Sequence, residues 1–515
     1  MKPELFNSLK NYKKSNILND LLAGLMVAII ALPLSIALGI QSVPESVSTN
    51  GIQFGIITAI VAGFFISALG GSRFQIGGPT AAFVVILYSY IANPDIGILG
   101  LAIAGVMAGV ILIVMGFLKL GSVMKFFPYP ITIGFTTGIG ITLFIGQIKD
   151  FCGLTSGGTE AIEKIISYFK NIATFNLPTF AVGLIGLIIV IIIPKINKKI
   201  PSAFVALIAC TLITVLVNSF ADGSIATIGS KYGEISAGFF PINFSSIGNV
   251  KFGALIVPAI VIAFLCAIES LLSATVAAGM TNTTFNTNQE LVGQGVANIF
   301  SSLLGGLPAT GAIARTAAGI ENGAKSPLTG VFHALFVLLM YFALMDVMKY
   351  IPLCVFSAIL MSVAINMSRF KLFAKLTRFG VRDTTILIVT CVLTVIFDLT
   401  YGVIGGVVVT FVMNAKNIKI GLKKDTILTD GEKTVKLSGA MIFLNANGAC
   451  EYINKELDSV TRITVDMKDV ESIDQTSLEK LAGTKKRAAI QGKEIELVGC
   501  NDKVNSRIEK FINVF

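Results

Sequence analysis

The stretch GGPTAA at residues 77–82 interrupts an otherwise apolar sequence, and the related stretch GGLPAT does so again at residues 305–310. Each one opens a short apolar segment, at 78–91 and 310–320, that is too short for a helix to cross a hydrocarbon core of about 30 Å. Glycine and proline start or interrupt helices. The two stretches therefore predict two helices that begin inside a membrane.

A helix that begins inside a membrane exposes N–H groups without helical partners and the positive end of its dipole. Such groups must line a wet cavity enclosed by protein. Two of these ends facing each other form an anion site without a buried lysine or arginine. The small residues that let an anion approach the backbone are Thr80, Ala81, Ala82, Thr310, Gly311 and Ala312. The competing interpretation, ordinary helix kinks, explains a single stretch better than a matched pair.

Most of the chain is suited to a bilayer. The protein has 515 residues, of which 54% are hydrophobic and 14% are charged, and its mean hydropathy is +0.81. A soluble chain carries roughly 25% charged residues. Long apolar runs recur from Leu21 to residue 415. Lipid therefore replaces water as the solvent for about four-fifths of the chain.

The apolar runs predict about fourteen membrane segments. They cover residues 20–41, 52–70, 78–91, 97–117, 129–148, 177–194, 202–219, 254–279, 289–304, 310–320, 328–345, 350–367, 383–398 and 401–415. With a cytoplasmic N-terminus (1–19), the basic clusters at 119–125, 195–199, 369–382 and 416–424 all fall inside. We therefore expect a multi-pass protein of the inner (cytoplasmic) membrane with both termini in the cytoplasm.

A loop near 220–250 divides the transport domain, expected over residues 20–425, into two groups of seven segments, 20–219 and 254–415. An odd number of segments inverts one group relative to the other, and both short segments are the third of their group. Interrupted segments at matching positions of two inverted repeats indicate a binding site near the membrane midplane.

From Asp430 the composition becomes that of a soluble α/β domain, expected over residues 430–515. Strands are predicted at 435–443, 462–467 and 495–499, and helices at 446–457, 476–489 and 504–511.

Glu269 is the most informative single residue. It lies deep within the segment 254–279, where a carboxylate is costly and usually faces a cavity. A carboxyl beside an anion site can carry a proton that travels with the anion, and Ser273 lies one turn further on the same face. The alternative is a protonated Glu269 that only hydrogen-bonds between helices.

Three further polar residues lie in apolar segments. Arg315, about one turn into its segment, can attract the anion or pair with Glu269, and a structural bond to backbone carbonyls is equally open. His333, the only histidine, is interpreted as a core residue. Asn298 is expected to hydrogen-bond between helices.

Several function classes are excluded. The net charge of +10 follows the positive-inside pattern rather than a nucleic-acid-binding face. Seven scattered cysteines without a CxxC pair argue against a disulfide framework or a metal site. One histidine allows no HExxH site, and no phosphate-binding loop is present. We therefore expect neither an enzyme nor a cofactor.

The motifs around Glu269 resemble a known family. The run ESLL at 269–272 is followed by NQELVGQGVAN at 288–298, and QIGGPTAA stands at 75–82. The first segment reads DLLAGL at 20–25 and LPLS at 32–35. Together these are similar to the sulfate permease (SulP) family of anion transporters. The C-terminal region is similar to the STAS domain (sulfate transporter and anti-sigma-factor antagonist) that follows these transporters.

The resemblance implies a polytopic α-helical fold with a seven-plus-seven inverted repeat, two half-helices meeting at the midplane, a small cytoplasmic STAS domain, and a homodimer. It also implies a substrate site between the first, third, eighth and tenth segments, which adds Ser35 and Phe83 to the candidate residues. Stand-alone STAS proteins carry a phosphorylated serine where this chain has Gln475, so phosphorylation is not expected there.

The expected function is secondary active transport of a small inorganic anion or carboxylate, such as sulfate, bicarbonate or a dicarboxylate, by alternating access. A proton as the coupled ion needs only the Glu269 carboxyl, whereas sodium needs several oxygen ligands, so we favour the proton. An uncoupled exchanger or channel and a sodium-coupled symporter stay open. The residues do not identify the anion.

Overall fold

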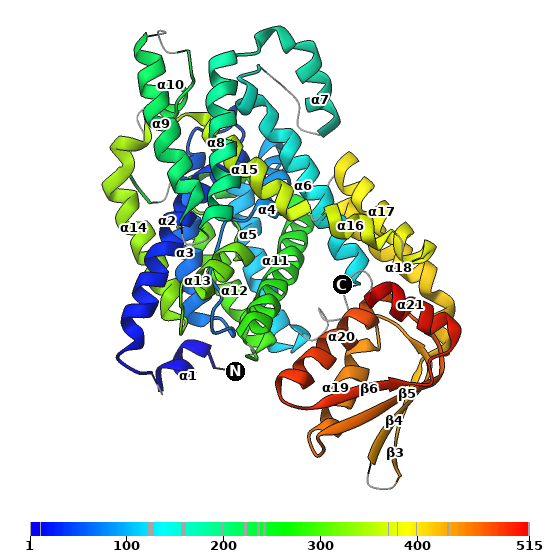
Figure 1. Ribbon diagram of the computed structural model, residues 1–515. Coiled ribbons are helices and arrows are strands. Elements are labelled where there is room, and N and C mark those ends of the chain that lie inside the picture. Colours follow the sequence, from blue (N-terminus) through cyan, green and yellow to red (C-terminus); the bar gives the residue numbers. More distant parts are fainter. Residues whose placement is uncertain are drawn as a thin grey trace. The chain divides into compact units, whose positions relative to one another are not determined.

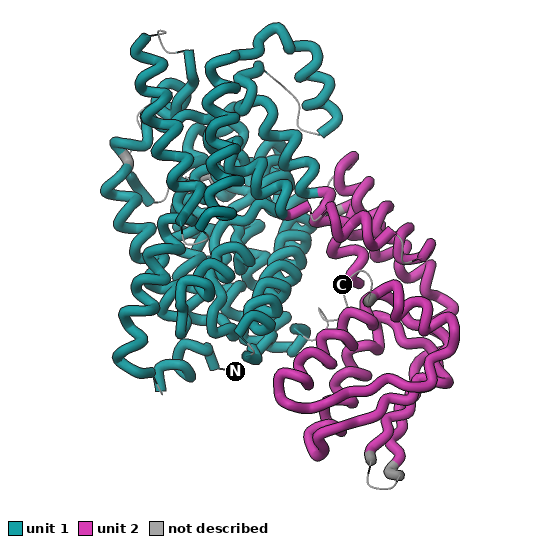
Figure 2. The backbone as a smooth tube through the Cα atoms, viewed as in Figure 1, with its two compact units in different colours: residues 1–124, 139–366 teal, residues 125–138, 367–515 magenta. Residues whose placement is uncertain are grey.

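The computed structural model describes residues 2–10, 12–121, 128–155, 161–197, 200–220, 224–233, 237–239, 244–281, 283–368, 370–377, 380–397, 399–429 and 432–512. The chain forms two compact units, coloured separately in Figure 2. Unit 1 comprises residues 1–124 and 139–366, and unit 2 comprises residues 125–138 and 367–515. Five residues of the basic clusters lie outside the described residues: Lys125, Lys198, Lys199, Arg369 and Arg378.

Long helices make up almost all of unit 1 (Figure 1). They are α1 Glu4–Lys10, α2 Asn16–Ser42, α3 Gly51–Leu69, α4 Ala81–Ala92, α5 Gly97–Phe117, α6 Tyr129–Cys152, α7 Ala161–Lys170, α8 Leu177–Ile196, α9 Ser202–Phe220, α10 Ile228–Tyr232, α11 Phe252–Thr281, α12 Thr287–Leu303, α13 Ile313–Glu321, α14 Leu328–Met348 and α15 Leu353–Ser368. The first residues of α6 and the last of α15 belong to unit 2.

Every range expected to form a membrane segment contains a helix. Among the described residues, nine helices are long and apolar enough to cross a membrane. Helix α4 has 12 residues and α13 has 9, so at 1.5 Å per residue they extend about 18 Å and about 14 Å. Both fall short of a hydrocarbon core, as the interrupted sequence predicts.

Glycines set the closest helix contacts in unit 1. Helix α12 packs against α5 and α3, and α14 packs against α2 and α3. A Cβ atom on Gly109 of α5 would lie 2.6 Å from the carbonyl oxygen of Gly295 in α12, and one on Gly295 would lie 2.5 Å from that of Gly109. Small residues allow such backbone approach, which stabilises helix packing in lipid.

Unit 2 contains the last membrane helices and the soluble domain. Helices α16 Phe370–Leu376, α17 Val381–Ile396 and α18 Leu399–Ile420 are followed by β3 Leu422–Thr429, β4 Glu432–Met441, α19 Ala446–Leu457, β5 Arg462–Ile473, α20 Gln475–Ile490, β6 Glu494–Val498 and α21 Asp502–Ile512. The sheet order is β3-β4-β5-β6, with β3 antiparallel to β4 and the other pairs parallel.

Strand β3 was not expected from the sequence, and it begins at Leu422, inside the range 20–425 assigned above to the transport domain. Its residues Lys423, Lys424 and Asp425 have low strand propensity. They form a strand because β4 pairs with them from Leu422 opposite Gly439 to Thr429 opposite Glu432. The soluble domain's sheet therefore starts before Asp430.

Candidate functional site

Two short strands place the starts of the half-helices side by side. Strand β1, Gly77–Gly78, directly precedes α4, and β2, Thr310–Gly311, directly precedes α13. They pair antiparallel, Gly77 opposite Gly311 and Gly78 opposite Thr310. The Ala312 N–H donates to the Ile76 carbonyl over 2.9 Å. The pairing satisfies backbone groups that lipid would leave unpaired, and it brings the two positive helix ends together.

Glu269 of α11 contacts the start of α13. The Thr310 hydroxyl donates to Glu269 Oε2 over 3.2 Å, and the Gly311 N–H donates to the Ser270 hydroxyl over 3.1 Å. Glu269 keeps some exposed surface, while Thr310 and Ser270 are fully buried. The carboxyl thus lies within one hydrogen bond of the β2 strand and remains accessible.

Arg315 is held by backbone and a hydroxyl. Its guanidinium donates to the Gly77 carbonyl over 3.0 Å and to the Ser35 hydroxyl over 3.0 Å, and the residue is 2% exposed. Within the part of the chain that the structure describes, it forms no ion pair with Glu269. The sequence left open whether Arg315 attracts the anion, pairs with Glu269 or bonds structurally to backbone carbonyls. These contacts agree with the structural role. The arginine charge still lies beside β1.

Gly78 is required by this arrangement. Its φ is +151°, and a Cβ atom there would lie 1.5 Å from Arg315 Nη1. No other residue type fits without displacing the guanidinium.

The α4 start is apolar except for one hydroxyl. Ala81, Ala82 and Phe83 are buried, and Thr80 is partly exposed just before the helix. The Thr80 hydroxyl has no hydrogen-bond partner of acceptable geometry among the described residues. Its oxygen is buried and lies close to the Glu269 carboxyl, so the hydroxyl can turn to that carboxyl or to a bound anion.

The two candidate serines serve the packing of the site. Ser35 donates its hydroxyl proton to the Ala31 carbonyl over 2.7 Å and accepts from Arg315. Ser273 is fully buried, and its hydroxyl lies 3.5 Å from that of Thr316. Thr316 in turn accepts the Ile76 N–H over 3.1 Å. Ser273 thus contacts β1 indirectly, through Thr316.

Ala312 is the N-cap residue of α13 and is partly exposed.

Sequence reasoning assigned no role at this site to three residues that position the strands. The Gln75 amide donates to the Ser270 carbonyl over 3.0 Å. Asn298 forms two hydrogen bonds with Ala309. Its amide oxygen accepts the Ala309 N–H over 2.9 Å, and its amide nitrogen donates to the Ala309 carbonyl over 3.0 Å. Glu290 accepts the Gly71 and Ser72 N–H groups over 2.8 and 3.0 Å. The sequence did contain a signal that could have pointed to them, because all three residues lie within the family-like runs at 75–82 and 288–298.

His333 is fully buried, in agreement with its interpretation as a core residue. Its ring lies against Gly63, where an added Cβ atom would approach Nδ1 to 3.2 Å.

In the soluble domain, Asp474 fixes the start of α20. Its carboxylate accepts the N–H groups of Ser477 and Phe443 over 2.8 and 2.6 Å. Burial raises the pKa of Asp474 above its ordinary value, and these hydrogen bonds oppose the rise. The neighbouring Gln475 is fully buried, and its amide side chain cannot be phosphorylated.

Two family models match the chain. The Sulfate permease family model matches residues 17–390, and the STAS domain model matches residues 423–513. The first includes all the residues of the β1–β2 site, and the second starts within β3.

Named relatives are transporters. The chain is 42% identical over 410 residues to the "Putative sulfate transporter YvdB" of Bacillus subtilis, covering 78% of this chain and 74% of that protein. It is 29% identical to the "Bicarbonate transporter BicA" of Picosynechococcus, covering 96% and 91%. The solved transmembrane domain of a cyanobacterial bicarbonate transporter BicA superposes with a TM-score of 0.68 at 30% identity, covering 75% of this chain and 97% of that domain.

Proposed function

Because the chain belongs to the sulfate permease family, we propose that it is a secondary active transporter that carries a small anion through the β1–β2 site by alternating access. The observation that carries the proposal is the pairing of two half-helix starts at Gly77–Gly78 and Thr310–Gly311. Their positive ends converge beside the Thr80 hydroxyl and the buried Arg315 charge.

The substrate proposed is sulfate, bicarbonate or a similar small anion, with a dicarboxylate as the larger alternative. Relatives named for sulfate and for bicarbonate support the first two. The small side chains of Ala81 and Ala82 leave the first backbone N–H groups of α4 open to oxyanion oxygens. The N–H groups of Gly311 and Ala312 already donate to Ser270 and Ile76. This donor set does not discriminate between the candidates.

The coupled ion proposed is the proton, carried by Glu269. The Glu269 carboxyl accepts a hydrogen bond from Thr310, lies close to the Thr80 hydroxyl, and forms no ion pair among the described residues. A fixed negative charge so close to an anion site opposes binding unless it is neutralised when the anion arrives. Protonation of Glu269 supplies that neutralisation, which couples the two ions. A sodium ion bound at the same carboxyl is the second candidate.

The test uses purified protein in sodium-free proteoliposomes with labelled sulfate and labelled bicarbonate as alternative substrates. We expect acidic external buffer to drive uptake of one of them against its gradient. Sodium added at constant pH and membrane potential should change the rate little. Uptake that requires sodium and ignores the pH gradient would contradict proton coupling, and failure of every small anion would contradict the transport assignment.

We also propose that the N-terminus and the STAS domain are cytoplasmic, that the protein works as a homodimer in the cytoplasmic membrane, and that the STAS domain is not needed to form the anion site. The basic residues Lys416, Lys419, Lys423 and Lys424 support this orientation. A cysteine introduced at Ser438 should resist an impermeant thiol reagent added to intact cells and react after lysis. Labelling from outside in intact cells would reverse the topology.

A further inference from the structure

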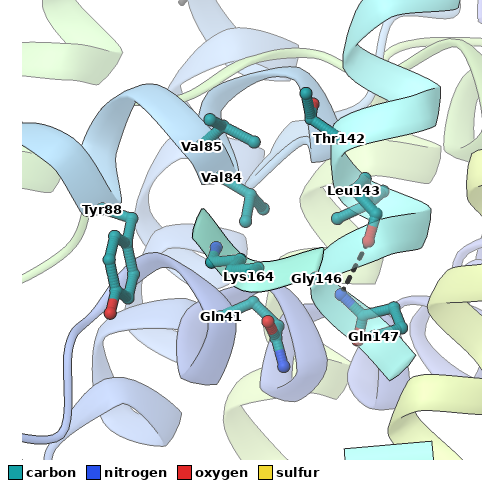
Figure 3. Close-up of a pocket in the computed structure, with 9 residues that line it drawn as sticks. All are labelled: Gln41, Val84, Val85, Tyr88, Thr142, Leu143, Gly146, Gln147 and Lys164. Carbon is teal, nitrogen blue, oxygen red and sulfur yellow. Dashed lines mark hydrogen bonds between the residues drawn. The ribbon is translucent and has the colours of Figure 1, made fainter. Parts of the chain in front are cut away.

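A small cavity lies between α2, α4, α6 and α7, and none of its wall residues belongs to the β1–β2 site (Figure 3). Its volume is about 30 Å³, and a water molecule needs roughly 10–15 Å³ by the same measure. It therefore holds about two water-sized particles. An oxyanion ester such as a lipid phosphate is too large for it.

Lys164 of α7 is the cation that lines this cavity. Its ammonium lies 5.0 Å from the centre of the Tyr88 ring, and it forms no hydrogen bond or ion pair with the other residues described here. Burial, together with the charge of Lys149, lowers the pKa of Lys164, and the exposed Glu163 opposes that fall. The ammonium thus lacks a close counter-ion.

Two carboxylates close to the cavity wall, Glu45 and Asp150, are paired with another lysine. Lys231 lies 2.5 Å from Glu45 and 3.5 Å from Asp150. Asp150 also accepts from Gln41, a residue of the cavity wall, over 3.3 Å. Glu45 and Asp150 are thus compensated by Lys231, so neither is the counter-ion of Lys164.

Gln147 of α6 gives an independent sign of an occupant. It is fully buried, its amide nitrogen donates to the Leu143 carbonyl over 3.2 Å (Figure 3), and its amide oxygen has no partner among the described residues. A buried acceptor without a donor is costly. A water that donates to Gln147 can donate its second hydrogen to an anion, and the volume suffices for both.

We propose that this cavity is a second anion site, which binds a single halide-sized anion together with one water, with Lys164 as the counter-charge. It goes beyond the transport function proposed above, because its residues are not those of the β1–β2 site. The nearest wall residue on α4, Val84, follows Thr80 by four residues, which is about 6 Å along a helix. Helix α7, which supplies Lys164, lies at the end of unit 1 opposite the N-terminus (Figure 1).

A single tryptophan can report on this site, because the chain contains none. Tyr88→Trp keeps an aromatic face for the ammonium and places a fluorophore in the cavity wall. Iodide quenches tryptophan on contact. We expect quenching with a saturable component that chloride suppresses, and caesium, a cationic quencher, should show no saturable component.

The decisive comparison is between two lysines of α7. In the Tyr88→Trp background, Lys164→Gln should weaken the saturable iodide binding about tenfold or more, since it removes the charge-assisted contact. Lys170→Gln, at the exposed end of the same helix, should leave it unchanged. Quenching that is linear in iodide, or equal in the two lysine variants, would overturn the proposal.

A second measurement, of the unfolding temperature, keeps Tyr88 unchanged. Replacing gluconate by chloride should raise the unfolding temperature of the wild-type protein and of Lys170→Gln, because a ligand of the folded state stabilises it. Lys164→Gln should lose that increase. An equal chloride effect in all three proteins would place the halide elsewhere and refute the site even if Tyr88→Trp fails to fold.

Discussion

The two half-helix starts are built differently, although β1 and β2 place them side by side. The start of α13 is surrounded by hydrogen bonds, with Thr310 donating to Glu269 and Gly311 donating to Ser270. The start of α4 has buried alanines and one hydroxyl, that of Thr80, without a partner in the described chain. The starts of α4 and α13, although similar in sequence and position, therefore differ in their hydrogen bonds.

This difference suggests a division of labour at the site. The α13 start donates a hydrogen bond to the carboxyl that we propose as the proton carrier. The α4 start presents buried alanines and the Thr80 hydroxyl, which lies close to that carboxyl without a hydrogen bond of acceptable geometry. Arg315 connects the two, since it belongs to α13 but donates to Gly77 of β1. Changes on the α13 side should alter coupling, and changes on the α4 side should alter anion affinity.

The largest effect is expected from Gly78→Ala, which breaks the connection between the two starts. The added methyl group would lie 1.5 Å from Arg315 Nη1, at a φ of +151° that other residues rarely adopt. We expect anion uptake by proteoliposomes to fall to background. Gly97→Ala is the matched control, because Gly97 also has a positive φ, of +60°, but nothing lies within 4 Å of its added Cβ. Equal losses in both variants would mean that backbone strain alone is responsible.

The next effect concerns coupling. Glu269→Gln keeps the shape of the side chain and can still accept from Thr310, but it cannot carry a proton. We expect a folded protein that no longer accumulates anion in response to a pH gradient, and that still exchanges anion down its own gradient. Glu321→Gln, an exposed position at the end of α13, should accumulate normally. Undiminished concentrative uptake by Glu269→Gln would remove this carboxyl from the mechanism.

The positions of the helices could be predicted from the sequence, but the connections at the site could not. Apolar length predicts helices because lipid allows few other structures, and the Gly/Pro runs marked α4 and α13. Strands β1 and β2 have two residues each, too few for any periodicity to appear. The partners of Arg315 are 238 and 280 residues away in sequence, so only the folded chain reveals them.

Sequence reasoning also did not predict strand β3 of the soluble domain or helix α7 of a connecting loop. Strand β3 carries Lys423, Lys424 and Asp425 and depends on pairing with β4, which local propensity does not contain. Helix α7, with Lys164 on its cavity side, lies between two membrane segments that dominate any hydropathy profile. Sequence reasoning thus predicted the membrane helices and singled out Glu269, whose role stays a prediction, but it did not predict the cavity at Lys164.

The smallest effects should come from removing single hydroxyls, and they give the sharpest test of the comparison. Thr80→Val and Thr310→Val each replace a hydroxyl by a methyl group of similar size. Thr310→Val removes the hydrogen bond that Glu269 accepts with good geometry, worth about 1.5–3 kcal/mol when the acceptor is charged. The protonated and ionised forms of the carboxyl are then stabilised differently from the wild type, so the pH dependence of uptake should shift with little change in KM. Thr80→Val breaks no hydrogen bond of acceptable geometry, although the hydroxyl lies close to Glu269. It should raise KM for the anion about fivefold, equivalent to about 1 kcal/mol, with a smaller shift of the pH profile than Thr310→Val. Uptake against pH and against anion concentration, measured for both variants, separates the two outcomes. If both variants shift KM alone, or both shift the pH profile alone, the two half-helix starts act alike and the division of labour is wrong.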